Sequence, residues 1–303
     1  MELRIRNLSK SYGGLQALKD VSLTIGAGIF GLLGPNGAGK STLMRILATL
    51  QEADAGEAAL RDDDGEIDVL RDKESVRRML GYLPQEFGLY PRVTAWRMLD
   101  HLAELKGVRR NRRTLVEALL RQTHLWEARD QRLGTFSGGM KQRFGIAQAM
   151  IGDPRLIIVD EPTAGLDPEE RVRFHNMLSE IGERCIVILS THIVSDVSEL
   201  CPAMAILHRG EVLVSGDPVE LASALGGRVW QASVPRADLA ECQQTLPVIS
   251  SRLSAGRTLI RVLGAQQPGP DFEAVLPEVE DVYFAAMREA GGAGLAANGA
   301  APC

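Results

Sequence analysis

The stretch Gly34-Pro35-Asn36-Gly37-Ala38-Gly39-Lys40-Ser41-Thr42 decides the fold class of this 303-residue chain. It matches the pattern G-x-x-x-x-G-K-[ST], in which glycines let backbone N–H groups turn towards phosphate oxygens. The apolar residues 29–33 before it predict a buried strand. The apolar residues after it recur at helical spacing: Leu43, Ile46, Leu47 and Leu50. A phosphate held here would lie at a helix N-terminus, so the sequence predicts a nucleoside triphosphate site.

A second apolar run, residues 156–159, ends in two acidic residues, Asp160 and Glu161. Ligand sites in open α/β sheets lie at such strand ends. Asp160 has the chemistry of a Mg²⁺ ligand, directly or through water, and Ser41 can add a hydroxyl. Glu161 can polarise a water in line with the terminal phosphate. The alternative, a strand ending in two solvated acids, is disfavoured by the phosphate loop.

Ser137-Gly138-Gly139 predicts a second helix N-terminus. Ser137 and the free N–H groups there would form a second anion site, although a plain N-cap is the alternative. Two separate anion sites in one chain are explained if two copies meet head to tail. Each copy then closes the other's nucleotide in a two-fold symmetric dimer.

Seven motifs, in this order, resemble those of the nucleotide-binding subunit of an ATP-binding cassette (ABC) transporter over about residues 2–220. They are Tyr12, the loop Gly34–Thr42, Gln85, Ser137-Gly138-Gly139, Asp160-Glu161, Ala164-Gly165-Leu166-Asp167 and His192. The resemblance implies an α/β fold, a P-loop NTPase cassette. This cassette has an antiparallel β subdomain, a parallel-rich core sheet and a helical subdomain, followed here by a small C-terminal α+β appendage.

The resemblance also implies a role for each motif in ATP hydrolysis. Tyr12 would stack on adenine, and the phosphate loop with the Lys40 ammonium would hold the phosphates. Ser41, Gln85 and Asp160 would organise Mg²⁺. Glu161 would position or deprotonate the water, and His192 would contact the terminal phosphate. Ser137, Gly138, Gly139 and Asp167 of the other copy would complete the site.

Two features favour an exporter of the drug, polysaccharide or small-lipid (ABC-2) type. The signature segment begins with Phe136 and ends with Met140, where Leu and Gln are commonest in the family, and the segment Glu280–Phe284 points the same way. We therefore expect a subunit that drives export through a separate transmembrane permease. The alternative is a soluble ABC ATPase acting on nucleic acid or ribosomes. Such proteins usually carry tandem cassettes or a long coiled coil, and no sustained heptads occur here.

Composition agrees with this expectation. The hydrophobic and charged contents, 45% and 24%, are those of a globular protein. No apolar stretch approaches the roughly 18–20 residues that span a bilayer, and residues 1–4 do not resemble a signal peptide. We expect a cytoplasmic protein held at the inner face of the cell membrane by the permease. The four cysteines have no metal or redox spacing.

The distribution of charge allows more than one interpretation of a basic segment. The formal net charge of −5 argues against a general nucleic-acid binder, and no nucleic-acid partner is expected. The run Arg109–Arg113 is nevertheless densely basic. It suits a solvated loop, a patch that meets anionic lipid or a membrane partner, or a contact with phosphate backbone. No aromatic residues are interleaved there to stack on bases, which ranks the last alternative lowest.

The chain is expected to have three parts. Residues 2–225 form the ATPase domain, with a helical subdomain at about 86–136. Its helix-period stripe is Val93, Trp96, Leu99, Leu102 and Ala103. Residues 226–288 form the appendage, with strand-like runs at 229–234 and 258–263 and helix-like runs at 235–243 and 279–288. Residues 289–303 are a disordered Ala/Gly tail.

Overall fold

The protein is described by a computed structural model that covers residues 1–62, 65–85, 87–163, 165–254 and 256–291. It divides into two compact units, Met1–Val212 and Leu213–Cys303. This division falls earlier in the chain than the boundary expected after residue 225. The limits of the functional domains therefore remain a prediction, and the predicted tail lies outside the described residues from 292 onwards.

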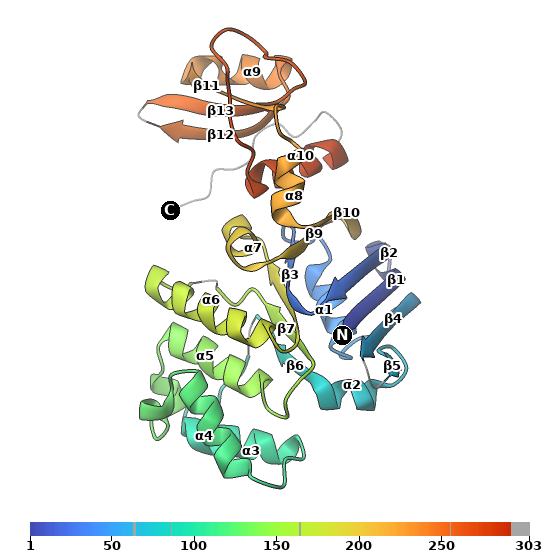
Figure 1. Cartoon of the computed structure of the whole chain (residues 1–303), viewed down its shortest axis with the longest axis vertical. Coiled ribbons are helices and arrows are strands. Elements are labelled where there is room, and N and C mark those ends of the chain that lie inside the picture. Colours follow the sequence, from blue (N-terminus) through green and yellow to red (C-terminus); the bar gives the residue numbers. More distant parts are fainter. Residues whose placement is uncertain (63–64, 86, 164, 255, 292–303) are drawn as a thin grey trace. The chain divides into compact units, whose positions relative to one another are not determined.

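Two sheets organise the first unit (Figure 1), and the last strand of the second sheet, β10, continues beyond Val212. The first is antiparallel, in the order β2-β1-β4-β5, from β1 (Glu2–Tyr12), β2 (Leu15–Gly26), β4 (Ala55–Asp62) and β5 (Gly65–Asp68). The second has the order β10-β9-β3-β8-β7-β6. Its strands are β3 (Gly28–Leu33), β6 (Leu80–Leu83), β7 (Leu156–Asp160), β8 (Ile186–Thr191), β9 (Ala203–His208) and β10 (Glu211–Gly216). From β9 to β6 the neighbours pair in parallel.

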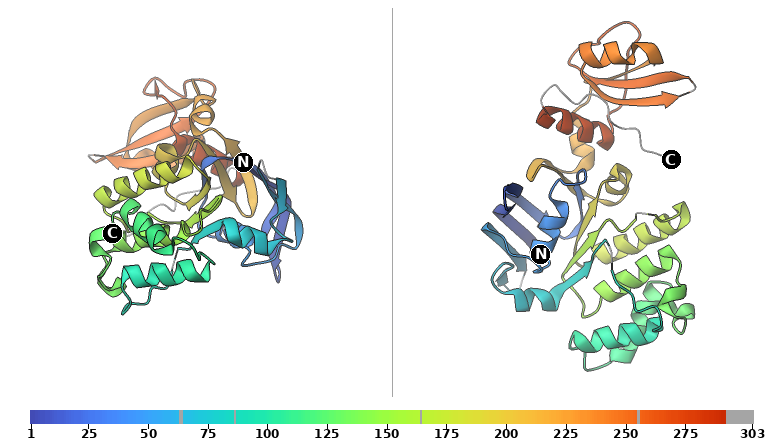
Figure 2. Two further views of the ribbon diagram at one scale, coloured as in Figure 1. Left: turned by 60° about the horizontal axis from the view of Figure 1, so that its bottom comes forward. Right: turned by 180° about the vertical axis from the view of Figure 1, so that it is seen from behind.

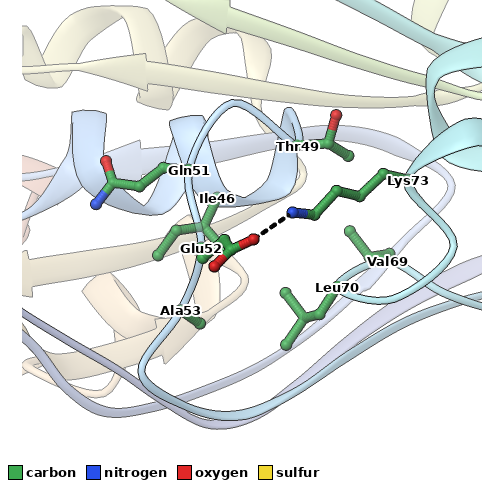
Figure 3. Close-up of a pocket in the computed structure, with 8 residues that line it drawn as sticks. All are labelled: Ile46, Thr49, Gln51, Glu52, Ala53, Val69, Leu70 and Lys73. Carbon is green, nitrogen blue, oxygen red and sulfur yellow. Dashed lines mark hydrogen bonds and ion pairs between the residues drawn. The ribbon is translucent and has the colours of Figure 1, made fainter.

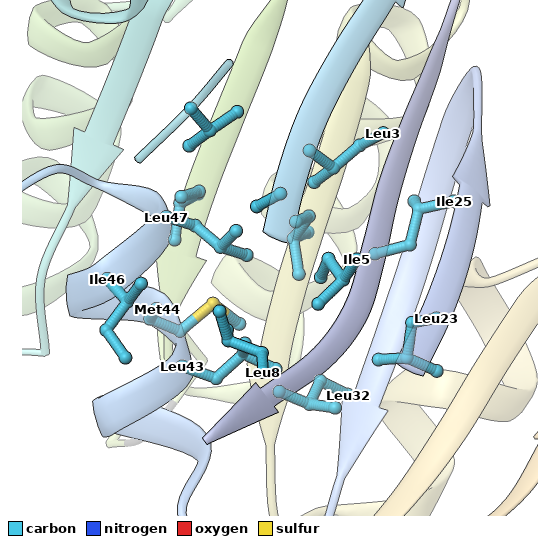
Figure 4. Packing of buried hydrophobic residues seen from close by; sticks show 14 of the residues in the cluster. Leu3, Ile5, Leu8, Leu23, Ile25, Leu32, Leu43, Met44, Ile46 and Leu47 are labelled. Atoms are coloured by element: carbon cyan, nitrogen blue, oxygen red, sulfur yellow. The ribbon is translucent and has the colours of Figure 1, made fainter. Parts of the chain in front are cut away.

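The strands of the second sheet are nearly continuous buried runs, as expected of a parallel sheet covered on both faces. One face packs against α1 (Lys40–Leu47) and the antiparallel sheet. Figure 4 shows Leu3 and Ile5 of β1, Leu23 of β2, and Leu43 and Leu47 of α1 meeting in this core. α2 (Lys73–Met79) precedes β6.

The other face of the parallel sheet is covered by α6 (Pro168–Gly182) and α7 (Val194–Leu200), which contact β3 and β8. Close approach of α7 requires a glycine in β3. A Cβ at Gly31 would stand 2.9 Å from Val197 Cγ1 and 3.0 Å from Cys201 Sγ.

A separate helical subdomain consists of α3 (Ala95–Leu105), α4 (Arg112–Gln122) and α5 (Gly138–Ala149), with short 3₁₀ turns at Trp126–Ala128 and Leu133–Thr135. Figure 2 shows these helices together at one end of the first unit. They enclose their own hydrophobic core. The predicted stripe faces it: Leu99 and Ala103 are fully buried, and Val93, Trp96 and Leu102 pack at its edge.

The second unit contains α8 (Pro218–Ser223), β11 (Val229–Pro235), a 3₁₀ turn at Arg236–Asp238, α9 (Leu239–Thr245), β12 (Val248–Ser254), β13 (Arg257–Leu263), β14 (Glu273–Ala274) and α10 (Val279–Gly291). Its sheet is antiparallel, in the order β12-β13-β11-β14. Its core includes Ala232, Ile260, Val262 and Phe272. Arg261 of β13 donates to Asp281 of α10 at 2.7 Å. The expected α+β character is confirmed, although β12 was not foreseen.

None of the described helices combines the length and the apolar character needed to cross a membrane. The α/β fold class with its antiparallel sheet, parallel core sheet and helical subdomain is as the sequence predicts.

Candidate functional site

Four neighbouring parallel strands end at the same edge of the sheet and lead into the phosphate loop and three further predicted site residues. β3 leads into the phosphate loop, β8 into His192, β7 into Glu161 and β6 into Gln85. The register aligns these ends, because Leu33 pairs with Thr191, Asp160 with Ser190, and Leu83 with Val159. Parallel pairing therefore brings together groups that lie far apart in the sequence.

The phosphate loop closes onto its own lysine. The Lys40 ammonium is 5% exposed and donates to the carbonyl oxygens of Gly34 at 2.6 Å and Pro35 at 3.2 Å. Gly39, the N-cap of α1, has φ +108°, and a Cβ there would stand 2.5 Å from the carbonyl oxygen of Ala17. Only glycine suits this position. No side chain caps α1, so its first N–H groups remain available to an anion.

Glu161 is the residue on which the site converges. Its Oε1 lies 3.9 Å from Lys40 Nζ and 3.2 Å from His192 Nδ1, and its Oε2 accepts a hydrogen bond from Gln85 Nε2 at 3.1 Å. The carboxylate is 12% exposed, whereas the His192 side chain is 46% exposed. Glu161 has φ +48°, an uncommon conformation for a non-glycine residue, and its N–H donates to the carbonyl oxygen of Ser190 at 2.9 Å. The backbone thus turns Glu161 out of the strand.

The electrostatics of Lys40 suit a phosphate ligand. Burial lowers the pKa of the Lys40 ammonium below its ordinary value, and the carboxylates of Glu161 and Asp160 act in the opposite direction. A phosphate would add negative charge beside the ammonium and further favour its charged form.

The donors near Asp160 suit Mg²⁺ bound jointly with phosphate. Asp160 is 5% exposed at the end of β7, and Ser41 lies on the first turn of α1. In the described part of the chain, no three His, Cys, Asp or Glu side chains cluster so as to hold a metal by themselves. One carboxylate plus a hydroxyl is nevertheless the kind of donor set that Mg²⁺ uses when phosphate oxygens supply the rest.

The predicted second anion site lies in the helical subdomain. Ser137 is the N-cap of α5, and its Oγ accepts from the N–H of Met140 at 3.2 Å, so the plain capping alternative describes its contact within this chain. Ser137 and Gly138 are exposed. Asp167 likewise caps α6, accepting from the N–H of Glu170 at 2.8 Å, with Pro168 following. Ala164 lies outside the described residues.

Tyr12 ends β1 with a 46% exposed side chain, and its hydroxyl accepts a hydrogen bond from Gln51 Nε2. It pairs with Leu15 of β2, and the carbonyl of Ala17 on that strand borders Gly39.

Gln51 lines a small pocket beside the end of α1, where Lys73 and Glu52 form an ion pair at 2.8 Å (Figure 3). None of the predicted site residues lines this pocket, although Tyr12 is hydrogen-bonded to Gln51, which does.

A family model described as "ABC transporter" matches residues 18–164. An uncharacterised ABC transporter ATP-binding protein, YxlF of Bacillus subtilis (strain 168), is 36% identical over 77% of this chain and 76% of its own length. The probable multidrug ABC transporter ATP-binding protein YbhF of Escherichia coli (strain K12) is 33% identical over 89% of this chain, which spans 47% of that protein.

Among solved structures, a dimeric ATP-binding cassette in a post-hydrolysis state with ADP and Pi is similar. Its TM-score is 0.63 at 27% identity, over 71% of this chain and 98% of that one.

Proposed function

The chain belongs to the ABC transporter family as an ATP-binding, ATP-hydrolysing subunit, and from this premise we propose that it works as a dimer that drives export through a separate membrane permease. One observation above all supports ATP hydrolysis at this site. Lys40, Gln85 and His192 all approach the carboxylate of Glu161. These are the groups that ATP hydrolysis requires beside the terminal phosphate: a cation, a polar positioning group and an acid–base pair.

In the proposed reaction, the loop N–H groups and the Lys40 ammonium bind the phosphates. Glu161 holds the attacking water through its carboxylate and accepts a proton from it as the oxygen attacks the terminal phosphorus. The phosphoanhydride bond then breaks, leaving ADP and phosphate. His192, placed 3.2 Å from Glu161, orients the carboxylate and contacts the terminal phosphate. Catalysis comes from positioning and from charge stabilisation.

Ser41, Asp160 and Gln85 would hold Mg²⁺, which neutralises charge on the phosphate oxygens when it is bound. Within the chain, Gln85 also donates to Glu161, so the same side chain would serve both the general base and the metal.

The dimer is supported by the exposure of Ser137 and Gly138 and by the dimeric cassette of similar structure. In the proposed dimer, Ser137, Gly138, Gly139 and Asp167 of one copy complete the nucleotide site of the other. Tyr12, with its exposed ring, would stack on adenine.

Export through a permease is supported by the similar multidrug ATP-binding protein and by the Phe136 and Met140 variants of the signature. Capture of the tagged, full-length chain from detergent-solubilised native membranes tests it. We expect a stoichiometric protein with several membrane spans, whose identity then indicates the substrate. Recovery only from the soluble fraction, bound to ribosomes or DNA, would contradict transport and support the alternative, a soluble ABC ATPase.

A further inference from the structure

Asp196, on α7, lies outside all the motifs described above, yet it is completely buried. Its Oδ2 accepts hydrogen bonds from the hydroxyls of Thr163 at 2.6 Å and Thr191 at 3.1 Å. Its Oδ1 lies 2.7 Å from Arg171 Nη2 and 3.1 Å from His175 Nε2. A buried carboxylate is costly unless its oxygens are paired. Here each oxygen has two partners, which makes Asp196 the centre of a buried polar cluster.

Each partner of Asp196 belongs to a segment that carries a proposed site residue. Thr163 follows Glu161 by two residues, and Thr191 directly precedes His192. The Thr191 hydroxyl also accepts from the N–H of Ile193 at 3.0 Å, so it holds the chain on both sides of His192. One carboxylate thus connects the segments of the general base and of the histidine.

The Oδ1 partners lie on α6, the helix that begins after Asp167. Arg171 is on its first turns and also donates to Ser195 Oγ at 2.6 Å, while His175 follows one turn later. Asp167 caps the same helix, so Asp196 ties α6 to the two catalytic segments.

Burial by itself would raise the pKa of Asp196, but hydrogen bonds from His175 and Thr163, together with the Arg171 charge, outweigh it and lower that pKa. The group is therefore a carboxylate anion at neutral pH, and all four contacts depend on that charge or on its lone pairs.

We propose that Asp196 is a positioning residue for ATP hydrolysis, which fixes the segments of Glu161 and His192 relative to each other and to the α6 helix. The inference rests on the proposed roles of Glu161 and His192. Its physical basis is that a displacement of about 1 Å in a catalytic group can cost on the order of 100-fold in rate.

Asp196→Asn tests the proposal, because it keeps the shape of the side chain and removes its charge. In the full-length protein we expect kcat to fall about tenfold or more through misplacement of Glu161, whereas ATP affinity changes by less than about threefold. Steady-state hydrolysis and titration with a fluorescent ATP analogue measure the two quantities. The matched control is Glu199→Gln. Glu199 is 59% exposed on the same helix and contacts the same His175 at 3.3 Å, but among the described residues no bond joins it to either catalytic segment.

Variants that remove the threonine hydroxyls distinguish a positioning role of Asp196 from a purely structural one. Thr163→Val removes one bond to Asp196 at nearly constant volume, whereas Thr163→Ser keeps it. We expect Thr163→Val to lower kcat, and Thr163→Ser to have a kcat close to that of the wild type. A wild-type kcat in both Thr163→Val and Thr191→Val would overturn the proposal, even if Asp196→Asn failed to fold. So would an Asp196→Asn protein with a lower melting temperature but wild-type kcat per folded molecule.

Glu161→Gln, assayed in parallel, separates the inference from the proposed function. If Glu161→Gln abolishes hydrolysis while the Asp196 and threonine variants retain it, only the positioning role is wrong. If Glu161→Gln hydrolyses ATP normally, the proposed role of Glu161 fails as well.

Discussion

At the scale of single residues, Glu161 combines an uncommon backbone conformation with three side-chain contacts. Its φ of +48° directs the carboxylate to the point where Lys40, Gln85 and His192 meet. Non-glycine residues in this conformation are few and often functional. The strain is held in place by parallel pairing of β7 and β8, which ends one residue earlier at Asp160 and Ser190.

Replacement of Glu161 by Gln should separate ATP binding from turnover. The amide keeps the size of the side chain but cannot accept the proton, so we expect kcat to fall by about 100-fold or more. The variant should bind ATP and accumulate as a closed dimer. Size-exclusion chromatography with light scattering, with and without ATP, measures the dimer, and phosphate release measures turnover.

Two further variants are compared with Glu161→Gln, one as a control and one as a test of ATP binding. Glu169→Gln alters an exposed carboxylate that pairs with Arg173 at the surface, and should leave kcat unchanged. Lys40→Ala removes the buried ammonium, and should weaken ATP binding by about tenfold or more through loss of a charge-assisted contact. A Glu161→Gln protein with near-normal hydrolysis would show that another group accepts the proton.

At the scale of secondary-structure elements, the packing of α7 on β3 has a consequence for pH. Cys201 caps the C-terminus of α7 and its Sγ lies against Gly31. Burial raises the pKa of the Cys201 thiol from 9.0 to about 12, and the negative charge of Asp196 acts in the same direction. The thiol therefore stays neutral in the folded state under conditions in which the unfolded chain ionises it.

Because the folded pKa is the higher one, the stabilising contribution of the neutral thiol is complete below pH 9 and is lost as pH rises from 9 towards 12. At pH 10 the loss is about 1 kcal/mol. Urea unfolding of the wild type and of Cys201→Ala at pH 8 and pH 10 measures it: the gap between their free energies of unfolding should shrink at pH 10. A gap independent of pH would contradict the burial of this thiol.

Most of the strands were predictable from the sequence, because continuous apolar runs such as 29–33 and 156–159 are typical of strands buried on both faces of a parallel sheet. β12 was missed because its sequence, with Ser250, Ser251 and Arg252, lacks an apolar pattern and is defined by pairing with β13. The Asp196 cluster was missed for a related reason. The partners of Asp196 lie 5 to 33 residues from it in the sequence, and only the folded arrangement of α6 and α7 brings them together.

For the site, motif spacing identified which residues to consider, and the sheet register explains why four of them meet. Sequence could not reveal that the ammonium of Lys40 bonds the carbonyl of Gly34, and it left the N-cap of Ser137 as an alternative that only the structure could decide. Those contacts depend on side-chain geometry that a pattern does not encode.

At the scale of the whole molecule, the two units have separate hydrophobic cores, and all the proposed nucleotide contacts within one chain fall in the first. We expect two calorimetric transitions. ATP with Mg²⁺ should raise the melting temperature of the first unit only, since ligand at 100 times its Kd stabilises by about 2.7 kcal/mol.

Ile260→Ala changes the stability of the second unit, as ATP changes that of the first. Ile260 is fully buried in its small core, so the change should destabilise that unit by about 2–5 kcal/mol and lower only the transition that ATP leaves unaffected. A single transition, shifted as a whole by both ATP and Ile260→Ala, would show that the units unfold together.

The aligned ends of β3, β8, β7 and β6 have a consequence for how this protein can evolve. Substitutions can alter one site residue at a time, but an inserted or deleted residue inside any of these strands shifts its end by about 3.3 Å and turns the following side chain to the opposite face. We therefore expect changes of length to be tolerated in connections such as Gly107–Asn111, which joins α3 to α4 far from these strand ends in the sequence. The connections can thus change in length, whereas the strands that align Lys40, Gln85, Glu161 and His192 must keep theirs for the site to form.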